Sequence, residues 1–293
     1  TSKEDGSFSF EGIPYGTWYI REIEQPAGFV LDDTVYPVSI GKDAQVVEIK
    51  IVNKYIRGNI HLTKVDAEYP DNKLTGATFE VYKDSNGSGK LDDGDELLGT
   101  LTEKEIGSYE MKDLFYGRYF VKETKAPEGF VLDTGVYEVM IDTDGKTCEV
   151  ENKAGVGFIN EAMRGNLKIV KTSSDGKIKG FAFRITGANG YDIILETNDK
   201  GEIVIEGIRI GDYTVSEVSN SASAMYVLPA DKKATVKTGS TTIVEMHNVL
   251  RDTPKTGDAT NLPLLYALAG LSAVGIAVTA FVGFKKKKKE GND

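Results

Sequence analysis

The sequence predicts an all-β chain of repeated β-sandwich modules, followed by one membrane-spanning helix. Throughout the first 261 residues, short runs of alternating apolar and polar residues are separated by Gly, Asp and Asn turns. Two short sequence motifs, used below as landmarks, recur in this region, and the distance between successive copies is about the length of one β-sandwich domain. A helix is expected only at residues 262–284, which form a long uncharged stretch.

The first landmark opens a module. Residues 57–64 read Arg-Gly-Asn-Ile-His-Leu-Thr-Lys, and 107 positions later residues 164–171 read Arg-Gly-Asn-Leu-Lys-Ile-Val-Lys. Repeats of this size predict an array of domains rather than one compact core.

The second landmark lies near the middle of each module and has the pattern Gly-x-aromatic-x-aliphatic-x-Glu. Its three copies are residues 16–22, 117–123 and 211–217. The first two copies are followed by Pro-x-Gly-Phe-Val-Leu, whose Pro and Gly end strands. The landmarks divide the chain into a first module (1–57) that lacks its opening strand, complete second (58–163) and third (164–250) modules, a polar connection (251–261), the helix (262–284) and a basic tail (285–293).

These modules resemble the Cna B-type, SpaA-pilin family, and the resemblance covers nearly all of residues 1–250. It implies a prealbumin-like, immunoglobulin-like β-sandwich for each module. It also implies a stalk of an adhesin or pilin on a Gram-positive cell surface.

Residues two apart in a strand share a face. By this rule, Lys, Glu and Asn residues in repeated contexts are predicted to lie on the apolar face of their strands. Burying an unpaired charge is costly, so an inward Lys and Glu should be neutralised through shifted pKa values or react. A neutral lysine amine is a nucleophile. The alternative is that these are ordinary surface residues whose strand faces are misassigned. The residues are Lys64 and Lys171, Glu22, Glu123 and Glu217, and Asn53, Asn152 and Asn248.

The family resemblance implies a reaction for these residues. In it, Lys attacks the Asn side-chain carbonyl, Glu shuttles protons, and ammonia leaves an isopeptide bond behind. Two sets are complete, and Glu22 and Asn53 belong to a set without a lysine. The complete sets are Lys64, Glu123, Asn152 and Lys171, Glu217, Asn248.

The asparagine of the second module is ambiguous. Asn160 lies 11 residues before Lys171, as Asn53 lies 11 before Lys64. Asn152 lies 29 residues after Glu123, close to the spacing of 31 in the other modules, whereas Asn160 would need 37. The spacing to the glutamate favours Asn152.

The carboxyl-terminal region has three parts in a fixed order. Residues 253–257 read Thr-Pro-Lys-Thr-Gly, residues 262–284 could span about 34 Å as a helix, and five lysines follow. A plain membrane anchor would explain the helix and the lysines but not the pentapeptide.

This order resembles a sortase sorting signal, in which the pentapeptide is usually Leu-Pro-x-Thr-Gly. The resemblance implies cleavage between Thr256 and Gly257 and covalent transfer of Thr256 to peptidoglycan or to another pilin subunit, after the helix has held the chain in the membrane. Pro254 would fix an extended backbone. Thr253 replaces the usual Leu, which leaves the sortase class open, and Lys255 fills the variable position.

An acidic loop at residues 84–95 nearly matches the spacing of a calcium-binding loop. The alternative is a solvated hairpin loop without metal, because acidic Gly-rich turns are common between strands. The candidate ligands are Asp84, Asn86, Ser88, Asp92 and Asp95.

Composition excludes several other functions. The net charge of −10 combines +3 in residues 285–293 with −13 elsewhere, which argues against a nucleic-acid partner.

Cys148 is the only cysteine, so no intrachain disulfide can form, and it is predicted to face inward. His61 and His247 are predicted to face outward. Apart from calcium no cofactor is expected, and no enzymatic activity beyond self cross-linking.

The resulting expectation is a stalk at the cell surface, exported through an upstream signal peptide and attached by sortase to the cell wall. Two alternatives stay open: the modules themselves bind a host or matrix ligand, or they anchor an upstream surface enzyme.

Overall fold

The computed structural model describes residues 2–251, and all regular elements in that range are β-strands. The all-β class predicted from the sequence is therefore confirmed. No helix of the described part is long and apolar enough to cross a membrane. The predicted sorting motif, helix and basic tail lie outside the described residues. The chain forms two compact units that meet in sequence between Arg164 and Gly165.

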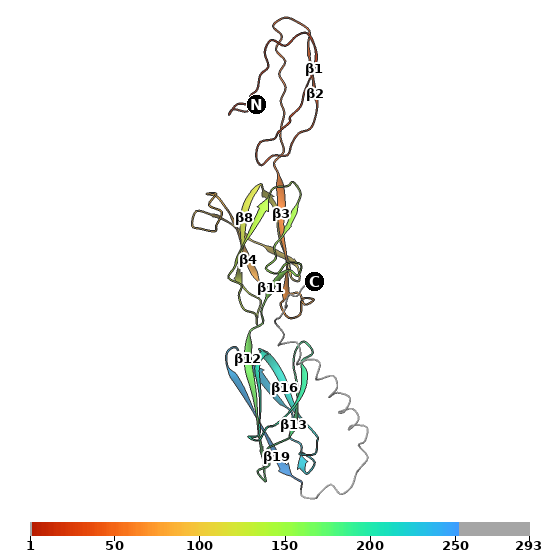
Figure 1. The fold of residues 1–293 in the computed structure, drawn as a ribbon, viewed down its shortest axis with the longest axis vertical. Coiled ribbons are helices and arrows are strands. Elements are labelled where there is room, and N and C mark those ends of the chain that lie inside the picture. The colour runs from red at the N-terminus through yellow and green to blue at the C-terminus, as the bar shows by residue number, and fades with distance from the viewer. Residues whose placement is uncertain (1, 252–293) are drawn as a thin grey trace, which may run out of the picture. The chain divides into compact units, whose positions relative to one another are not determined.

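The first module contains one antiparallel pair of strands, β1 (Gly16–Ile20) and β2 (Tyr36–Ile40) (Figure 1). Several large apolar side chains of this module are exposed, including Trp18 at 43%. The module closes with an isolated bridge between Phe29 and Tyr55, whose rings stack with centroids 4.6 Å apart.

The second module is a sandwich of two sheets. One sheet has the order β10-β3-β7-β6, with β11 also paired to β3, and the other has the order β5-β4-β8-β9. Side chains from both sheets form one buried core, including Ile60, Leu62, Phe79 and Val121. The strands are β3 (Arg57–Asp66), β4 (Thr78–Lys83), β5 (Glu96–Thr100), β6 (Thr102–Glu105), β7 (Ser108–Phe115), β8 (Gly117–Lys125), β9 (Val136–Ile141), β10 (Thr147–Glu149) and β11 (Phe158–Asn160).

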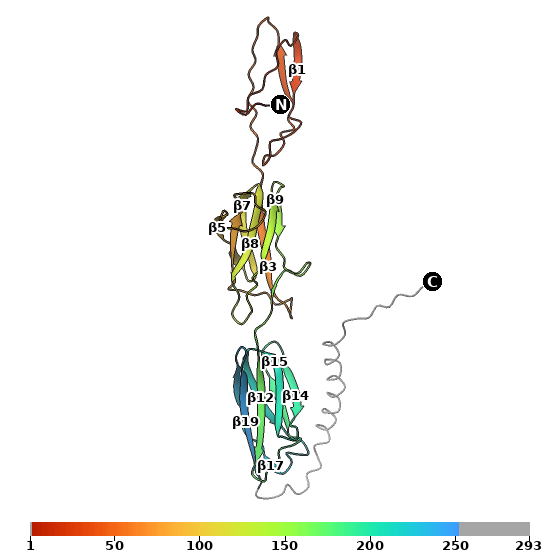
Figure 2. The ribbon, with the colours of Figure 1, turned by 60° about the vertical axis from the view of Figure 1, so that its left-hand side comes forward.

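The third module repeats this arrangement with sheets β15-β12-β19-β17 and β14-β13-β16-β18. Its core includes Leu167, Ile169, Val215 and Met246, all nearly inaccessible to solvent. Figure 2 shows β12 and β19 side by side in one sheet. The strands are β12 (Arg164–Ser173), β13 (Ala182–Thr186), β14 (Asp192–Glu196), β15 (Glu202–Arg209), β16 (Gly211–Val218), β17 (Tyr226–Val227), β18 (Lys232–Val236) and β19 (Thr241–Leu250).

In both complete modules the first strand pairs in parallel with the last. In the third module this pairing keeps one register over eight successive residue pairs of β12 and β19. In the second module, Ile60 pairs with Cys148, 88 positions later, whereas Lys64 pairs with Phe158, 94 positions later. Six extra residues therefore leave the last strand between β10 and β11.

The second landmark has a structural reason in each module. Its glycine adopts a positive φ, +147° at Gly117 and +135° at Gly211, a region that side chains disfavour. Its aromatic residue then donates a hydrogen bond to the carbonyl four residues earlier, which fixes the approach to the strand. These bonds run from Trp18 to Pro14 (3.0 Å), from Tyr119 to Phe115 (2.6 Å) and from Tyr213 to Arg209 (2.9 Å).

Candidate functional site: buried Lys, Glu and Asn side chains

Three strands supply the buried polar set of the second module. Lys64 on β3, Glu123 on β8 and Asn160 on β11 are 0%, 0% and 3% exposed. Asn160 Nδ2 donates a hydrogen bond to Glu123 Oε2 at 2.8 Å, and Lys64 Nζ donates to the Phe158 carbonyl at 3.0 Å. A lysine, a carboxyl group and a primary amide thus share one water-poor core.

Burial sets the protonation of this set. Desolvation lowers the pKa of Lys64 to about 8, although the charges of Glu123, Asp133 and Asp66 act in the opposite direction. Desolvation likewise raises the pKa of Glu123, against the hydrogen bond from Asn160 and the charge of Lys64. Both shifts favour neutral forms, in which the amine is a nucleophile and the carboxyl group is a proton donor.

The third module holds the same set on equivalent strands. Lys171 on β12, Glu217 on β16 and Asn248 on β19 are 1%, 8% and 0% exposed. Asn248 Nδ2 donates to Glu217 Oε1 at 2.7 Å. Lys171 Nζ donates to the Thr172 carbonyl and lies 4.1 Å from the ring centroid of Phe181. Burial again lowers the pKa of Lys171 and raises that of Glu217.

Oxygen atoms of both sets lack hydrogen-bond partners. Of the five buried side-chain polar atoms without a partner in the described residues, four are Glu123 Oε1, Asn160 Oδ1, Glu217 Oε2 and Asn248 Oδ1. Leaving such an atom unpaired costs about 1–3 kcal/mol. A proton on the free carboxyl oxygen, shared with the amide oxygen, would satisfy both atoms, and it would polarise the amide carbonyl.

The first module contains two members of such a set. Asn53 Nδ2 donates to Glu22 Oε1 at 2.7 Å, and the backbone amide of Asp32 donates to Glu22 Oε2 at 2.9 Å. Both side chains are partly buried. The glutamate–asparagine pairing is thus the same in all three modules.

The sequence-based choice between the two asparagines of the second module is corrected. Asn160, and not Asn152, lies against Glu123. Asn160 pairs with Asp66, two residues after Lys64, just as Asn248 pairs with Ser173, two residues after Lys171. The six extra residues in the last strand account for the spacing of 37 in place of 31.

Aspartates near the lysines were missed from the sequence. Asp133 accepts hydrogen bonds from the Tyr137 hydroxyl (2.8 Å) and from Asn152 Nδ2 (2.6 Å). In the third module, Asp175 accepts one from the Tyr226 hydroxyl (2.6 Å). Each aspartate acts to raise the pKa of its lysine. The sequence does contain a pattern that could have pointed to Asp133, because Asp-x-x-x-Tyr occurs in the first two modules, at 32–36 and 133–137.

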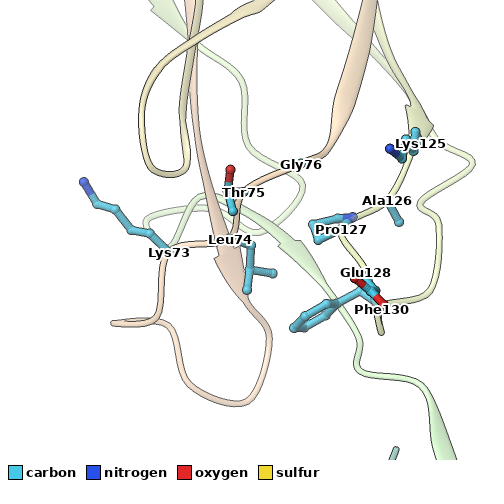
Figure 3. A pocket seen from close by; sticks show the side chains of 9 residues that line it. All are labelled: Lys73, Leu74, Thr75, Gly76, Lys125, Ala126, Pro127, Glu128 and Phe130. Carbon is cyan, nitrogen blue, oxygen red and sulfur yellow. The ribbon is translucent and has the colours of Figure 1, made fainter. Parts of the chain in front are cut away.

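The second module has a cavity of about 760 Å³, which none of the three set residues lines. Figure 3 shows Leu74 and Phe130 on its two walls. The backbone amide of Leu74 donates to the Lys64 carbonyl, and the carbonyl of Val131, next to Phe130, accepts a hydrogen bond from Asn160 Nδ2. One wall is therefore hydrogen-bonded to the backbone of Lys64, and the other adjoins the residue that accepts from Asn160.

The candidate calcium loop lies between β4 and β5. Its carboxylate oxygens already accept hydrogen bonds: Asp84 from the Ser88 and Gly89 amides, Asp92 from Asn86 Nδ2, and Asp95 from the Asp92 amide. Residues 2–251 contain no group of three or more His, Cys, Asp or Glu arranged to hold a metal. These bonds within the loop favour the alternative of a hairpin loop without metal.

Both histidines form hydrogen bonds on the outer face of a sheet. His61 Nδ1 lies 2.7 Å from Glu149 Oε2, and its Nε2 lies 2.9 Å from Ser108 Oγ. This serine–histidine–glutamate series crosses β7, β3 and β10 and was not expected from the sequence. His247 Nδ1 lies 2.8 Å from Thr172 Oγ1, between the first and last strands of the third module. Cys148 is partly buried against the core.

Fold and site together define a class of protein: tandem β-sandwiches in which a Lys of the first strand and an Asn of the last strand are buried with a Glu from the other sheet. The chain belongs to the SpaA prealbumin-like fold domain family, whose model matches residues 1–55, 58–154 and 165–250. The family resemblance inferred from the landmarks is thereby confirmed.

Individual relatives are more distant. The trypsin-resistant surface T6 protein of Streptococcus pyogenes serotype M6 is 26% identical over 204 residues, which are 59% of this chain and 35% of that protein. The Bacillus anthracis TIE protein has a similar structure, with a TM-score of 0.62 and 24% identity over 85% of this chain and 44% of that one. The chain thus spans less than half the length of each of these two relatives.

Proposed function

We propose that this chain is part of a cell-surface stalk of the pilin or adhesin type, whose modules cross-link themselves through Lys64–Asn160 and Lys171–Asn248 isopeptide bonds. The observation that carries the proposal is the meeting of a buried lysine, glutamate and asparagine in both complete modules. The surface location is supported by the family and by the streptococcal relative, which is a surface protein.

The proposed reaction needs no external reagent. The neutral lysine Nζ attacks the asparagine Cγ while the protonated glutamate donates to the amide oxygen. The glutamate then accepts a proton from Nζ and passes one to the amide nitrogen. The C–N bond to that nitrogen breaks and ammonia leaves. The oxygen returns its proton to the glutamate as the new carbonyl forms, so the glutamate ends protonated, as it began.

Intact mass tests the cross-links. We expect the protein to weigh less than its sequence by two ammonia molecules, with none lost from the first module. The isosteric changes Glu123→Gln and Glu217→Gln remove the proton carrier of one module each, so each should restore one ammonia to the mass. A mass that matches the sequence would overturn the cross-links.

Wall attachment is proposed from the sequence order at the carboxyl end. Sortase would cleave the Thr256–Gly257 bond and join Thr256 to peptidoglycan or to another pilin subunit. In a Gram-positive host, we expect the native protein to resist detergent extraction and Thr256→Ala to be extracted with the membrane. Equal extraction of both would favour a plain membrane anchor.

A further inference from the structure

Asn152 belongs to the six-residue insertion that interrupts the last strand of the second module. The third module reaches Asn248 along one unbroken strand, β19. In the second module the chain leaves β3 after Glu149 and rejoins it at Phe158, only two residues before Asn160. A three-residue strand that follows a loop needs further hydrogen bonds to fix its position, because it forms few hydrogen bonds with its neighbouring strand.

The Asn152 side chain supplies hydrogen bonds like those of a strand neighbour. Its Oδ1 accepts from the Ile159 amide at 2.6 Å, and its Nδ2 donates to the Ile159 carbonyl at 2.8 Å. On the other edge of β11, the Asn160 carbonyl accepts from the Ala67 amide at 3.1 Å. The short strand is thus bonded on both edges, to β3 and its extension on one side and to a side-chain amide on the other.

The same amide also connects to the reactive set. Asn152 Nδ2 donates to Asp133 Oδ2 at 2.6 Å, and the Asp133 amide donates to Glu123 Oε2 at 2.8 Å. Burial raises the pKa of Asp133, but the bonds from Asn152, the Gly135 amide and the Tyr137 hydroxyl outweigh it and keep this pKa below its ordinary value. Asp133 therefore stays a carboxylate beside Lys64.

We propose that Asn152 is a positioning residue for the second module's cross-link: it closes the insertion, sets β11 in register and so places the Asn160 amide against Glu123. This inference rests on the proposed isopeptide bonds. In the first module, which has the shorter spacing of 31 residues between Glu22 and Asn53, Asp32 keeps the equivalent bond to the glutamate without help from such an amide. Asn152 is thus needed because of the six-residue insertion, and it is not a reactant in the cross-linking step.

The test follows the cross-links in the whole protein by mass spectrometry of proteolytic fragments during refolding. Asn152→Ala should slow formation of the Lys64–Asn160 bond at least about tenfold, since two or more hydrogen bonds are lost. The Lys171–Asn248 bond in the same molecules should form at the wild-type rate. Asn72→Ala, an exposed asparagine of the same module, is the matched control and should change neither rate.

A second variant separates positioning from chemistry and from simple misfolding. Deleting residues 152–157 removes Asn152 together with the insertion and places Asn160 31 residues after Glu123, as in the other modules. This deletion should restore rapid formation of the Lys64–Asn160 bond. Slow formation in the deletion variant would refute the positioning role, as would wild-type rates in Asn152→Ala. If the unaltered protein forms neither bond, the proposed function itself fails.

Discussion

Replacing Lys171 with Met removes the proposed cross-link of the third module while keeping an unbranched apolar stem in the core. The bond would close a loop of about 78 residues, and constraining the unfolded chain to this extent is worth about 4.5 kcal/mol by the loop-entropy relation used for disulfides. For a module of this size, each kcal/mol shifts the midpoint of thermal unfolding by about 4–8 °C. The midpoint of Lys171→Met should therefore fall by about 20–35 °C.

Differential scanning calorimetry of the whole protein measures this shift, and only the transition of the third module should move. Lys168→Met is a matched control on the same strand. Its side chain makes a part-exposed ion pair with Glu202, with the Lys168 Nζ 2.6 Å from an Oε atom, so about 0–1 kcal/mol is at stake. If mass spectrometry finds the bond in the native protein and yet both variants lower the midpoint equally, the entropy argument is wrong.

Bond formation in the second module should depend on pH, because it needs a neutral Lys64 amine and a protonated Glu123 carboxyl group at the same time. Above about pH 8 the amine is already neutral and Glu123 is increasingly a carboxylate, so the rate should fall; below the raised pKa of Glu123 the amine is increasingly charged, so the rate should fall there too. Mass spectrometry after refolding at each pH measures the rate. Calcium should not raise the unfolding temperature relative to EDTA, because the loop's own N–H groups already bind its carboxylates, and a rise of several degrees that Asp92→Asn abolishes would contradict this. Gly165→Ala should destabilise the third module by about 1–3 kcal/mol in chemical denaturation, since an added Cβ would lie 2.2 Å from the Lys237 carbonyl oxygen, and an unchanged midpoint would contradict that clash.

Local alternation was enough to predict much of the site. Lys64, Lys171, Glu123 and Glu217 lie on the buried face of their strands, as expected from the apolar residues two and four positions before them. This succeeded because the period of two depends only on backbone geometry within one strand.

Pairing between distant segments could not be predicted in the same way. The register of the last strand on the first is set across about ninety positions, and because six residues are looped out, Asn160 lies against Glu123 in place of the expected Asn152. The better signal was the spacing of 11 residues from each asparagine to the next module's lysine, because that span contains no insertion. The series from Ser108 through His61 to Glu149 joins three strands and has no local pattern at all.

The parallel pairing of first and last strands has a mechanical consequence. Because the two strands run the same way, the chain enters a module at one end and leaves it at the other, so a pull on both termini shears the pair lengthwise. Once Lys64 is joined to Asn160, tension passes from the entering strand to the leaving strand through one covalent bond. Every residue between these two positions is then relieved of load, and a module with an intact bond cannot be drawn out into an extended chain.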